Sequence, residues 1–158
     1  MGEFTHIDKN GSVRMVDVTE KGITERVAVA KGYISMNRDT FDKIYNNQVK
    51  KGNVLETARI AGIMAAKKTH ELIPMCHPLN ITYAGVDFIP VDSESRINIR
   101  SEVRVTGQTG VEMEALTAVS ISALTIYDMC KSYDKEMVIS EILLSEKKGG
   151  KSGHFVRS

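Results

Sequence analysis

The chain has 158 residues, of which 42% are hydrophobic, a formal net charge of +1 and two cysteines. This length is typical of one domain, and this apolar content is enough to fill a hydrophobic core. A net charge near zero gives no general attraction to nucleic acid or to a membrane surface. The longest apolar runs, such as 61–66, are too short to span a bilayer. We therefore expect no nucleic-acid partner and no membrane partner.

The N-terminal segment MGEFTHIDKN lacks the apolar stretch of a signal peptide. We therefore expect a cytoplasmic protein in which Cys76 and Cys130 are reduced thiols, because two cysteines do not make a disulfide framework. Residues 1–23 are polar, contain glycines and show no hydrophobic period. This pattern predicts a mobile arm.

The next part of the chain predicts a strand followed by two helices. Residues 25–36 are rich in β-branched and small side chains, which is typical of a strand, with a bend at Gly32. Residues 38–47 predict a short helix and residues 53–70 a longer one with small residues along one surface. Asn53 is a good N-cap for the longer helix.

The second half predicts a hairpin, a long helix and a final strand. The expected elements are a strand over 81–91, a turn over 92–95, a strand over 96–106, a helix over 110–133 and a strand over 137–145. The strand over 96–106 alternates apolar and polar residues, so one of its faces is expected to be buried. Thr109 and Glu112 have the spacing of a capping box at the start of the long helix.

This order of elements is a split βαβ pattern with one additional helix. It predicts an α+β, ferredoxin-like sandwich with the helices on one face of an antiparallel sheet. We expect a mobile arm over 1–23, a ferredoxin-like domain over 24–147 and a flexible basic tail over 148–158. The fold does not define the function, which must come from the polar residues.

Two of the three prolines bracket Cys76 and His77 in the segment PMCHP. Each proline fixes its own φ and favours an extended conformation at the preceding residue, so the segment is restrained. Adjacent Cys and His have poor spacing for zinc, and their side chains point in opposite directions in an extended segment. Two interpretations of His77 stay open. It is either a proton donor or acid–base group in a pocket, or a histidine that caps backbone.

Two further features each allow two readings. Asp128 and Lys131 are three residues apart on a helix and can pair; the pair is either a surface ion pair worth at most about 1 kcal/mol or a carboxylate that tunes a lysine for proton transfer. The segment GGKSG over 149–153 lacks the first glycine and the following helix of a nucleotide-hydrolase loop. It is either a solvated end or a tail that closes over phosphates.

The segments 51–79 and 109–131 resemble the signature segments of the MoaC family of molybdenum cofactor biosynthesis. Residues 15–32 and the GGKSG tail also match, so the resemblance covers nearly the whole chain. It implies a lyase that converts a 3′,8-cyclised dihydroguanosine triphosphate to cyclic pyranopterin monophosphate and diphosphate. An upstream radical enzyme would supply this substrate.

The resemblance also implies the site residues. The family's catalytic residues correspond to Lys51, Asp128 and Lys131. The implied substrate-binding residues are Met75, Cys76, His77, Met113 and Glu114, with Glu112 beside them. Arg26 and Lys147 are additional cations for the triphosphate. No redox cofactor and no metal site are implied, and magnesium on the phosphates is compatible with the sequence.

We expect the active site to be built from more than one chain. Glu114 and Asp128 are fourteen residues apart on one helix, which separates them by about 21 Å. Lys51 and His77 flank opposite ends of another helix. Two chains packed antiparallel bring such ends together, and the family similarly forms a hexamer, a trimer of dimers.

Two other functions compete with this prediction. A non-enzymatic ferredoxin-like regulatory module that binds a small ligand needs few titratable groups in its pocket. An RNA-binding split βαβ domain needs exposed aromatic residues on its central strands, and the polar face of 96–106 has none.

Overall fold

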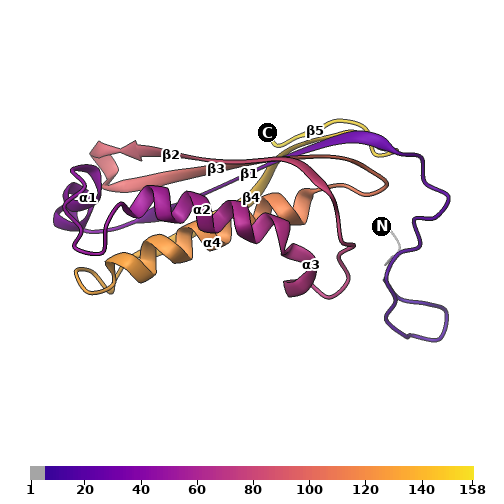
Figure 1. The fold of residues 1–158 in the computed structure, drawn as a ribbon, viewed down its shortest axis with the longest axis horizontal. Coiled ribbons are helices and arrows are strands. Elements are labelled where there is room, and N and C mark those ends of the chain that lie inside the picture. Colours follow the sequence, from indigo (N-terminus) through magenta and orange to yellow (C-terminus); the bar gives the residue numbers. More distant parts are fainter. Residues whose placement is uncertain (1–5) are drawn as a thin grey trace.

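The computed structural model describes residues 6–158, so the first five residues of the predicted arm lie outside the described part. The elements are β1 (Thr24–Ser35), α1 (Arg38–Tyr45), α2 (Val54–Lys67), α3 (Thr69–Leu72), β2 (Ile81–Val91), the 3-10 helix η1 (Asp92–Glu94), β3 (Arg96–Gly107), α4 (Glu112–Cys130), β4 (Val138–Lys148) and β5 (Phe155–Val156). The strands form one antiparallel sheet in the order β2-β3-β1-β4-β5. Figure 1 shows α2 and α4 beneath this sheet, and the predicted α+β ferredoxin-like fold is confirmed.

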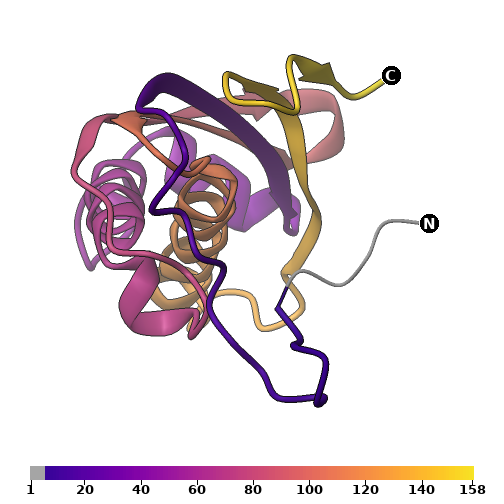
Figure 2. The same ribbon diagram turned by 90° about the vertical axis from the view of Figure 1, so that its right-hand side faces the viewer.

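The core lies between the sheet and the two long helices. β1 pairs with β3 along its whole length, so that Ala28 lies opposite Val103 and Ile34 opposite Ile97. All four side chains are fully buried. Figures 1 and 2 show that α2 and α4 run side by side in opposite directions. The apolar face of β3 that the alternation predicts is therefore the face that contacts the helices.

The small residues of α2 serve contact within the chain. A Cβ added at Gly62 would overlap the Ser122 hydroxyl and lie 2.9 Å from the carbonyl oxygen of Ala118, both on α4. The Ser122 hydroxyl donates to the carbonyl oxygen of Ala58, 3.1 Å away. The small-residue surface therefore packs against α4 of the same chain, and it is not available to a second chain.

The predicted end of the longer helix is wrong. The helix expected over 53–70 is capped by Asn53 as predicted but is interrupted at Lys68, where φ is −114°. The hydroxyl of Thr69 donates to the carbonyl oxygens of Ala65 and Ala66, which satisfies acceptors at the end of α2. Local side-chain hydrogen bonding of this kind leaves no glycine or proline signal in the sequence.

The predicted capping box at the start of α4 is also wrong. The N-cap is Val111, and no side chain caps the first turn. The carboxylate of Glu112 instead accepts a hydrogen bond from the Nζ of Lys147 at 2.8 Å. A contact with Lys147 on strand β4 therefore replaces the local contact that the spacing suggested.

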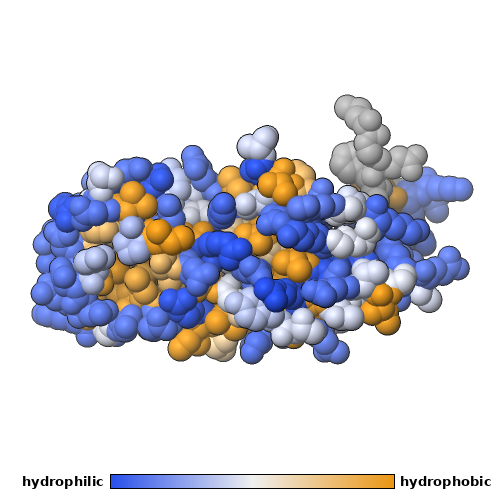
Figure 3. Space-filling view, turned by 90° about the horizontal axis from the view of Figure 1, so that it is seen from above, coloured by the Kyte–Doolittle hydropathy of each residue, from blue (hydrophilic) through white to orange (hydrophobic). Residues whose placement is uncertain are grey.

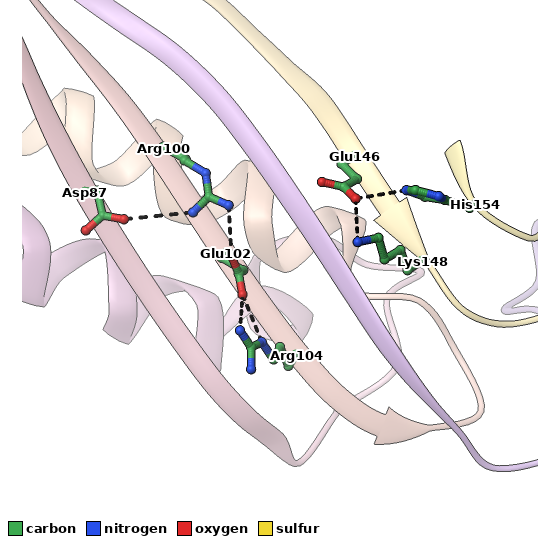
Figure 4. Close-up of polar contacts among 7 residues, drawn as sticks. All are labelled: Asp87, Arg100, Glu102, Arg104, Glu146, Lys148 and His154. Carbon is green, nitrogen blue, oxygen red and sulfur yellow. Dashed lines mark hydrogen bonds and ion pairs between the residues drawn. The ribbon is translucent and has the colours of Figure 1, made fainter. Parts of the chain in front are cut away.

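The open face of the sheet carries a ladder of charged side chains. Figure 3, seen from above the sheet, shows a mostly hydrophilic face with separate hydrophobic patches. On β3, Glu102 accepts hydrogen bonds from both Arg100 and Arg104, and Asp87 on β2 lies 3.9 Å from Arg100 (Figure 4). Opposite charges thus alternate along the strand and neutralise one another.

The tail turns back after β4, and its two-residue strand β5 pairs with Glu146 and Lys147. β4 extends three residues beyond the predicted end at 145. Figure 2 shows the segment before β1 passing in front of the helix ends. Among residues 6–158, no helix combines the length and the hydropathy that crossing a membrane requires.

Candidate functional site

The expected site residues form two groups at opposite ends of α4. One group, which we call the lysine cluster, consists of Lys51, Asp128 and Lys131 at the C-terminal end of α4. The other group lines two adjoining cavities at the N-terminal end of α4. Figure 1 shows the arrangement of these two groups. The chain enters α2 beside the C-terminal end of α4, and α3 lies beside the N-terminal end of α4.

The lysine cluster is held by short polar contacts within one chain. The Nζ of Lys131 donates to the Asp128 carboxylate at 2.7 Å, which confirms the predicted pair. The Nζ of Lys51 donates to the backbone oxygen of Asp128 at 3.0 Å and lies 4.0 Å from its carboxylate. All three side chains are at least half exposed, so two ammonium groups flank one carboxylate at the surface.

Lys131 is not in the environment of a desolvated base. The hydrogen bond to Asp128 raises the pKa of Lys131 above its ordinary value. The same hydrogen bond and the charges of Lys131 and Lys51 hold the pKa of Asp128 below its usual range. The ammonium form of Lys131 is therefore stabilised in this chain, which makes Lys131 a weaker acid than a free lysine.

The first cavity, of about 270 Å³, gathers most of the predicted substrate-binding residues. Its lining residues include Met75, Cys76, His77, Glu112, Met113 and Glu114. The restrained segment between the two prolines forms one wall, and the first turn of α4 forms another. The structure brings these two segments together around one cavity, and the role of their residues in binding stays a prediction.

His77 both lines the cavity and contacts backbone. Its Nε2 atom lies 2.8 Å from the carbonyl oxygen of Val16 in the N-terminal segment. A carbonyl oxygen only accepts, so Nε2 carries the hydrogen. In the neutral ring, Nδ1 is then the nitrogen with the free lone pair. The two alternatives for His77 are therefore compatible, since one nitrogen binds backbone and the other remains for a ligand.

Glu114 is the most buried acid of the site. Its side chain is 4% exposed. Burial, together with the charge of Glu112, raises its pKa to about 7. Burial and the nearby Glu114 also raise the pKa of the Cys76 thiol. Cys76 is thus disfavoured as a thiolate nucleophile, whereas Glu114 can exchange a proton near neutral pH.

The second cavity, of about 630 Å³, is lined by cations. Lys21 and Arg26 from one part of the chain and Lys147 and Lys151 from another lie around it. Glu112 lines both cavities, and its pairing with Lys147 joins them. Four positive side chains around one acid make this cavity suited to a polyanion.

The sequence did not single out several residues of these cavities. Lys21 and Gly110 line both of them, and Gln108 holds the N-terminal segment by donating to the carbonyl oxygens of Thr19 and Lys21. Gly110 matters because an added Cβ would overlap the carboxylate of Glu112. The match of 15–32 to the family included Lys21, but no local pattern shows that this segment folds back over the cavity.

The two groups lie on the same face of α4. Met113 and Lys131 are eighteen residues apart (131 − 113), which is five helical turns at 3.6 residues per turn and about 27 Å along the axis. Leu124 lies between them on this face and is 52% exposed. The exposed face of α4 therefore runs from the cavities to the lysine cluster, and one chain keeps them apart.

Residues 6–158 contain no group of three or more His, Cys, Asp or Glu side chains placed to hold a metal ion. Both cysteines are free thiols, and Cys130 is buried behind the lysine cluster, where burial raises its pKa to about 11. The polar titratable groups available at the site are thus carboxylates, lysines, one arginine and the histidines His6 and His77.

The fold and the two residue groups define a ferredoxin-like α+β protein that places acid–base residues and cations at the two ends of one helix. The model of the MoaC family matches residues 15–150. The chain therefore belongs to the MoaC family, as the sequence analysis predicted.

Curated relatives extend this match over nearly the whole chain. The chain is 64% identical to the cyclic pyranopterin monophosphate synthase of Desulforapulum autotrophicum, with 99% of this chain and 96% of that protein covered. It is 62% identical to the protein of the same name from Desulfatibacillum aliphaticivorans, covering 99% and 98%. The identity to the synthase of Heliobacterium modesticaldum is 57%, covering 99% of both. These names indicate an enzyme and disfavour the non-enzymatic regulatory module.

Proposed function

We propose that this chain is a cyclic pyranopterin monophosphate synthase. It converts (8S)-3′,8-cyclo-7,8-dihydroguanosine 5′-triphosphate to cyclic pyranopterin monophosphate and diphosphate in molybdenum cofactor biosynthesis, as a phosphorus–oxygen lyase. The observation that carries the proposal is the identity of 57% to 64% to synthases of this name over 99% of the chain. Because the substrate derives from guanosine triphosphate and both cysteines are free thiols, we assign the reaction to the cytoplasm.

The cationic cavity receives the triphosphate in this proposal. Attack of a hydroxyl of the substrate on the innermost phosphorus expels diphosphate and closes the cyclic phosphate. Arg26 and Lys147 lie where they can stabilise the charge of the leaving diphosphate. Lys147 is paired with Glu112 in this structure, so the phosphates compete with that carboxylate. Magnesium enters the proposal only as a counterion of the triphosphate.

The smaller cavity receives the purine-derived ring, whose opening and rebuilding need several proton transfers. Nδ1 of His77 supplies a lone pair, and Glu114, with a pKa of about 7, supplies or accepts a proton near neutral pH. Met75 and Met113 provide apolar contacts that adapt to a ring. These residues suit a reaction that requires no hydride and no radical.

The lysine cluster acts on substrate held by a second copy of the chain. Each chain carries both groups on one face of α4, about 27 Å apart. An antiparallel copy packed on this face brings the cluster of each chain to the cavities of the other, and a two-fold axis makes two sites. Exposed apolar residues such as Leu124 and Met113 lie on this face. We propose the hexamer, a trimer of dimers, as the complete assembly.

The direct test incubates the purified protein with the cyclised nucleotide, made beforehand by the upstream radical enzyme. We expect stoichiometric diphosphate and a product that oxidises to a fluorescent pterin. The Lys131→Ala protein serves as the control for contaminating activity. Intact nucleotide after incubation with well-folded wild-type protein would overturn the proposal.

A further inference from the structure

We propose that Gly150 is a positioning residue for the guanidinium group of Arg26, a role that rests on the proposed function. Arg26 lies near the start of β1 and lines the larger cavity. Gly150 lies in the turn that follows β4, and the tail brings it back to β1. The two residues are far apart in the sequence and in direct contact in the structure.

The first restraint on Arg26 is a hydrogen bond inside the sheet. Its Nε donates to the carbonyl oxygen of Gly107, 3.2 Å away at the end of β3. β1 and β3 are paired at this point, with Arg26 opposite Val105. The Nε atom is therefore tied to a rigid element, and the terminal nitrogens Nη1 and Nη2 remain to be placed.

The second restraint is the contact with Gly150. A Cβ added there would overlap Nη1 of Arg26 and lie 3.0 Å from its Cζ and 3.4 Å from its Nη2. Gly150 also has φ +76°, a conformation that side-chain-bearing residues rarely adopt. The guanidinium therefore lies directly against the bare backbone of the turn, where only glycine leaves it room.

The neighbouring glycine has a different part. A Cβ at Gly149 would overlap the backbone oxygen of Glu25 and lie 3.2 Å from the Cα of Arg26. It would press on the strand itself, which cannot move without disturbing the sheet. A side chain at 150 would instead press on the far end of a flexible side chain. Gly149 thus sets the path of the turn, and Gly150 sets the position of the guanidinium.

The Arg26 guanidinium is held by the Gly107 carbonyl oxygen and lies against Gly150. Its remaining N–H donors are therefore already in position when a ligand arrives. Such preorganisation favours the binding of phosphate groups, because the side chain loses little freedom when the ligand arrives. Replacing Gly150 by alanine should keep the fold and move the donors of Arg26 away from the phosphates.

Gly153 provides a matched control in the same tail. It has φ +68°, close to that of Gly150, and a Cβ added there would meet no atom within 4 Å. Alanine at 153 therefore imposes a similar backbone penalty without touching Arg26. Any difference between the two variants reports the contact with the guanidinium.

The test measures binding of sodium tripolyphosphate by calorimetry to the whole protein. We expect Gly150→Ala to weaken binding about tenfold, with circular dichroism unchanged, and Gly153→Ala to leave it within about twofold. In an Arg26→Ala background, Gly150→Ala should cause no additional loss, since no guanidinium is there to be displaced. With the cyclised nucleotide, KM should rise about tenfold while kcat changes less than about threefold.

Three results would overturn the positioning role. The first is equal affinity of wild type and Gly150→Ala for tripolyphosphate. The second is a loss of affinity from Gly150→Ala that is as large in the Arg26→Ala background as in the wild type. The third is no binding of tripolyphosphate to the wild type. A wild-type protein that binds tripolyphosphate but forms no product would instead overturn the proposed function. The binding series would still decide the role of Gly150 in that case.

Discussion

The buried carboxyl group of Glu114 makes the stability of the native state depend on pH. Its folded-state pKa, about 7, lies above that of an exposed glutamate. The unfolded chain therefore releases this proton first, and the native state loses stability as pH rises from about 4.3 to about 7, with no further change above. The shift corresponds to about 3 kcal/mol of unfolding free energy.

Glu114→Gln should remove this dependence. We expect the unfolding free energy of the variant, relative to wild type, to rise by about 3 kcal/mol between pH 4 and pH 8. Urea unfolding at fixed protein concentration measures it. Glu136→Gln is the control, because Glu136 is exposed and has no side-chain partner among residues 6–158. A difference between Glu114→Gln and wild type that is the same at both pH values would contradict a raised pKa.

Lys131 tests the chemistry of the lysine cluster. The lysine cluster acts on the substrate in our proposal, so Lys131→Ala should reduce turnover by on the order of 10²–10⁴-fold. The melting temperature should not change, since the side chain is half exposed. Lys51→Ala and Asp128→Asn should behave alike. Lys135→Ala is the control, because Lys135 is a nearby exposed lysine outside the cluster, and this variant should retain full turnover. Near-normal turnover of Lys131→Ala would show that Lys131 takes no part in the mechanism.

The family match names residues that the structure gathers at the two ends of α4, and their roles stay predictions. The match to the family identified Lys51, His77 and Asp128, and the structure brings each of them into one of the two groups. The raised pKa of Lys131 depends on a carboxylate placed by folding. The role of Lys21 depends on a segment that folds back over the cavities. The helical spacing of Asp128 and Lys131 indicates the first contact, whereas no local sequence pattern indicates the second.

At the scale of elements, β3 illustrates what alternation predicts. Its apolar residues face the helices as expected, and its charged residues form the ladder on the open face (Figure 4). Helix ends were harder to predict. α2 ends where the Thr69 hydroxyl binds backbone, and α4 begins without a cap because Glu112 binds Lys147. A periodic pattern gives the interior of an element, while its ends depend on tertiary contacts.

The charged ladder on β3 makes the unfolding free energy depend on pH in the opposite direction to Glu114. Hydrogen bonds from Arg100 and Arg104 lower the pKa of Glu102. Its stabilising contribution is therefore complete above the unfolded-state pKa and is lost as pH falls through the folded-state pKa. Glu102→Gln should reduce the unfolding free energy at pH 7 by about 1 kcal/mol.

Acid titration of unfolding checks this prediction. The difference between wild type and Glu102→Gln should vanish at a pH low enough to protonate Glu102 in the native state. Molar salt should also reduce it, because screening weakens partly exposed pairs. A difference that persists unchanged in acid would show that Glu102 stabilises the sheet by packing instead of by charge.

At the scale of the whole molecule, α4 separates the two halves of the proposed site. The sequence predicted this separation from the length of the helix, and the structure places the cavities and the lysine cluster at its two ends. The structure also shows which residues belong to the same half of the proposed site. Lys51 and Asp128 are in contact within one chain, so variants at these two positions damage the same half and cannot complement each other.

Lys51→Ala and His77→Ala are the pair that tests a shared site. When the two inactive proteins are unfolded and refolded together, half of the dimers contain one of each chain. In such a dimer one site carries both defects and the other carries none, so activity should return to about 25% of wild type. The matched control is the mixture of Lys51→Ala with Asp128→Ala, in which every site lacks part of the lysine cluster and activity should stay absent. Subunit exchange is verified by mass spectrometry of tagged chains. If both mixtures exchange subunits and remain equally inactive, the two halves of the site do not come from different chains.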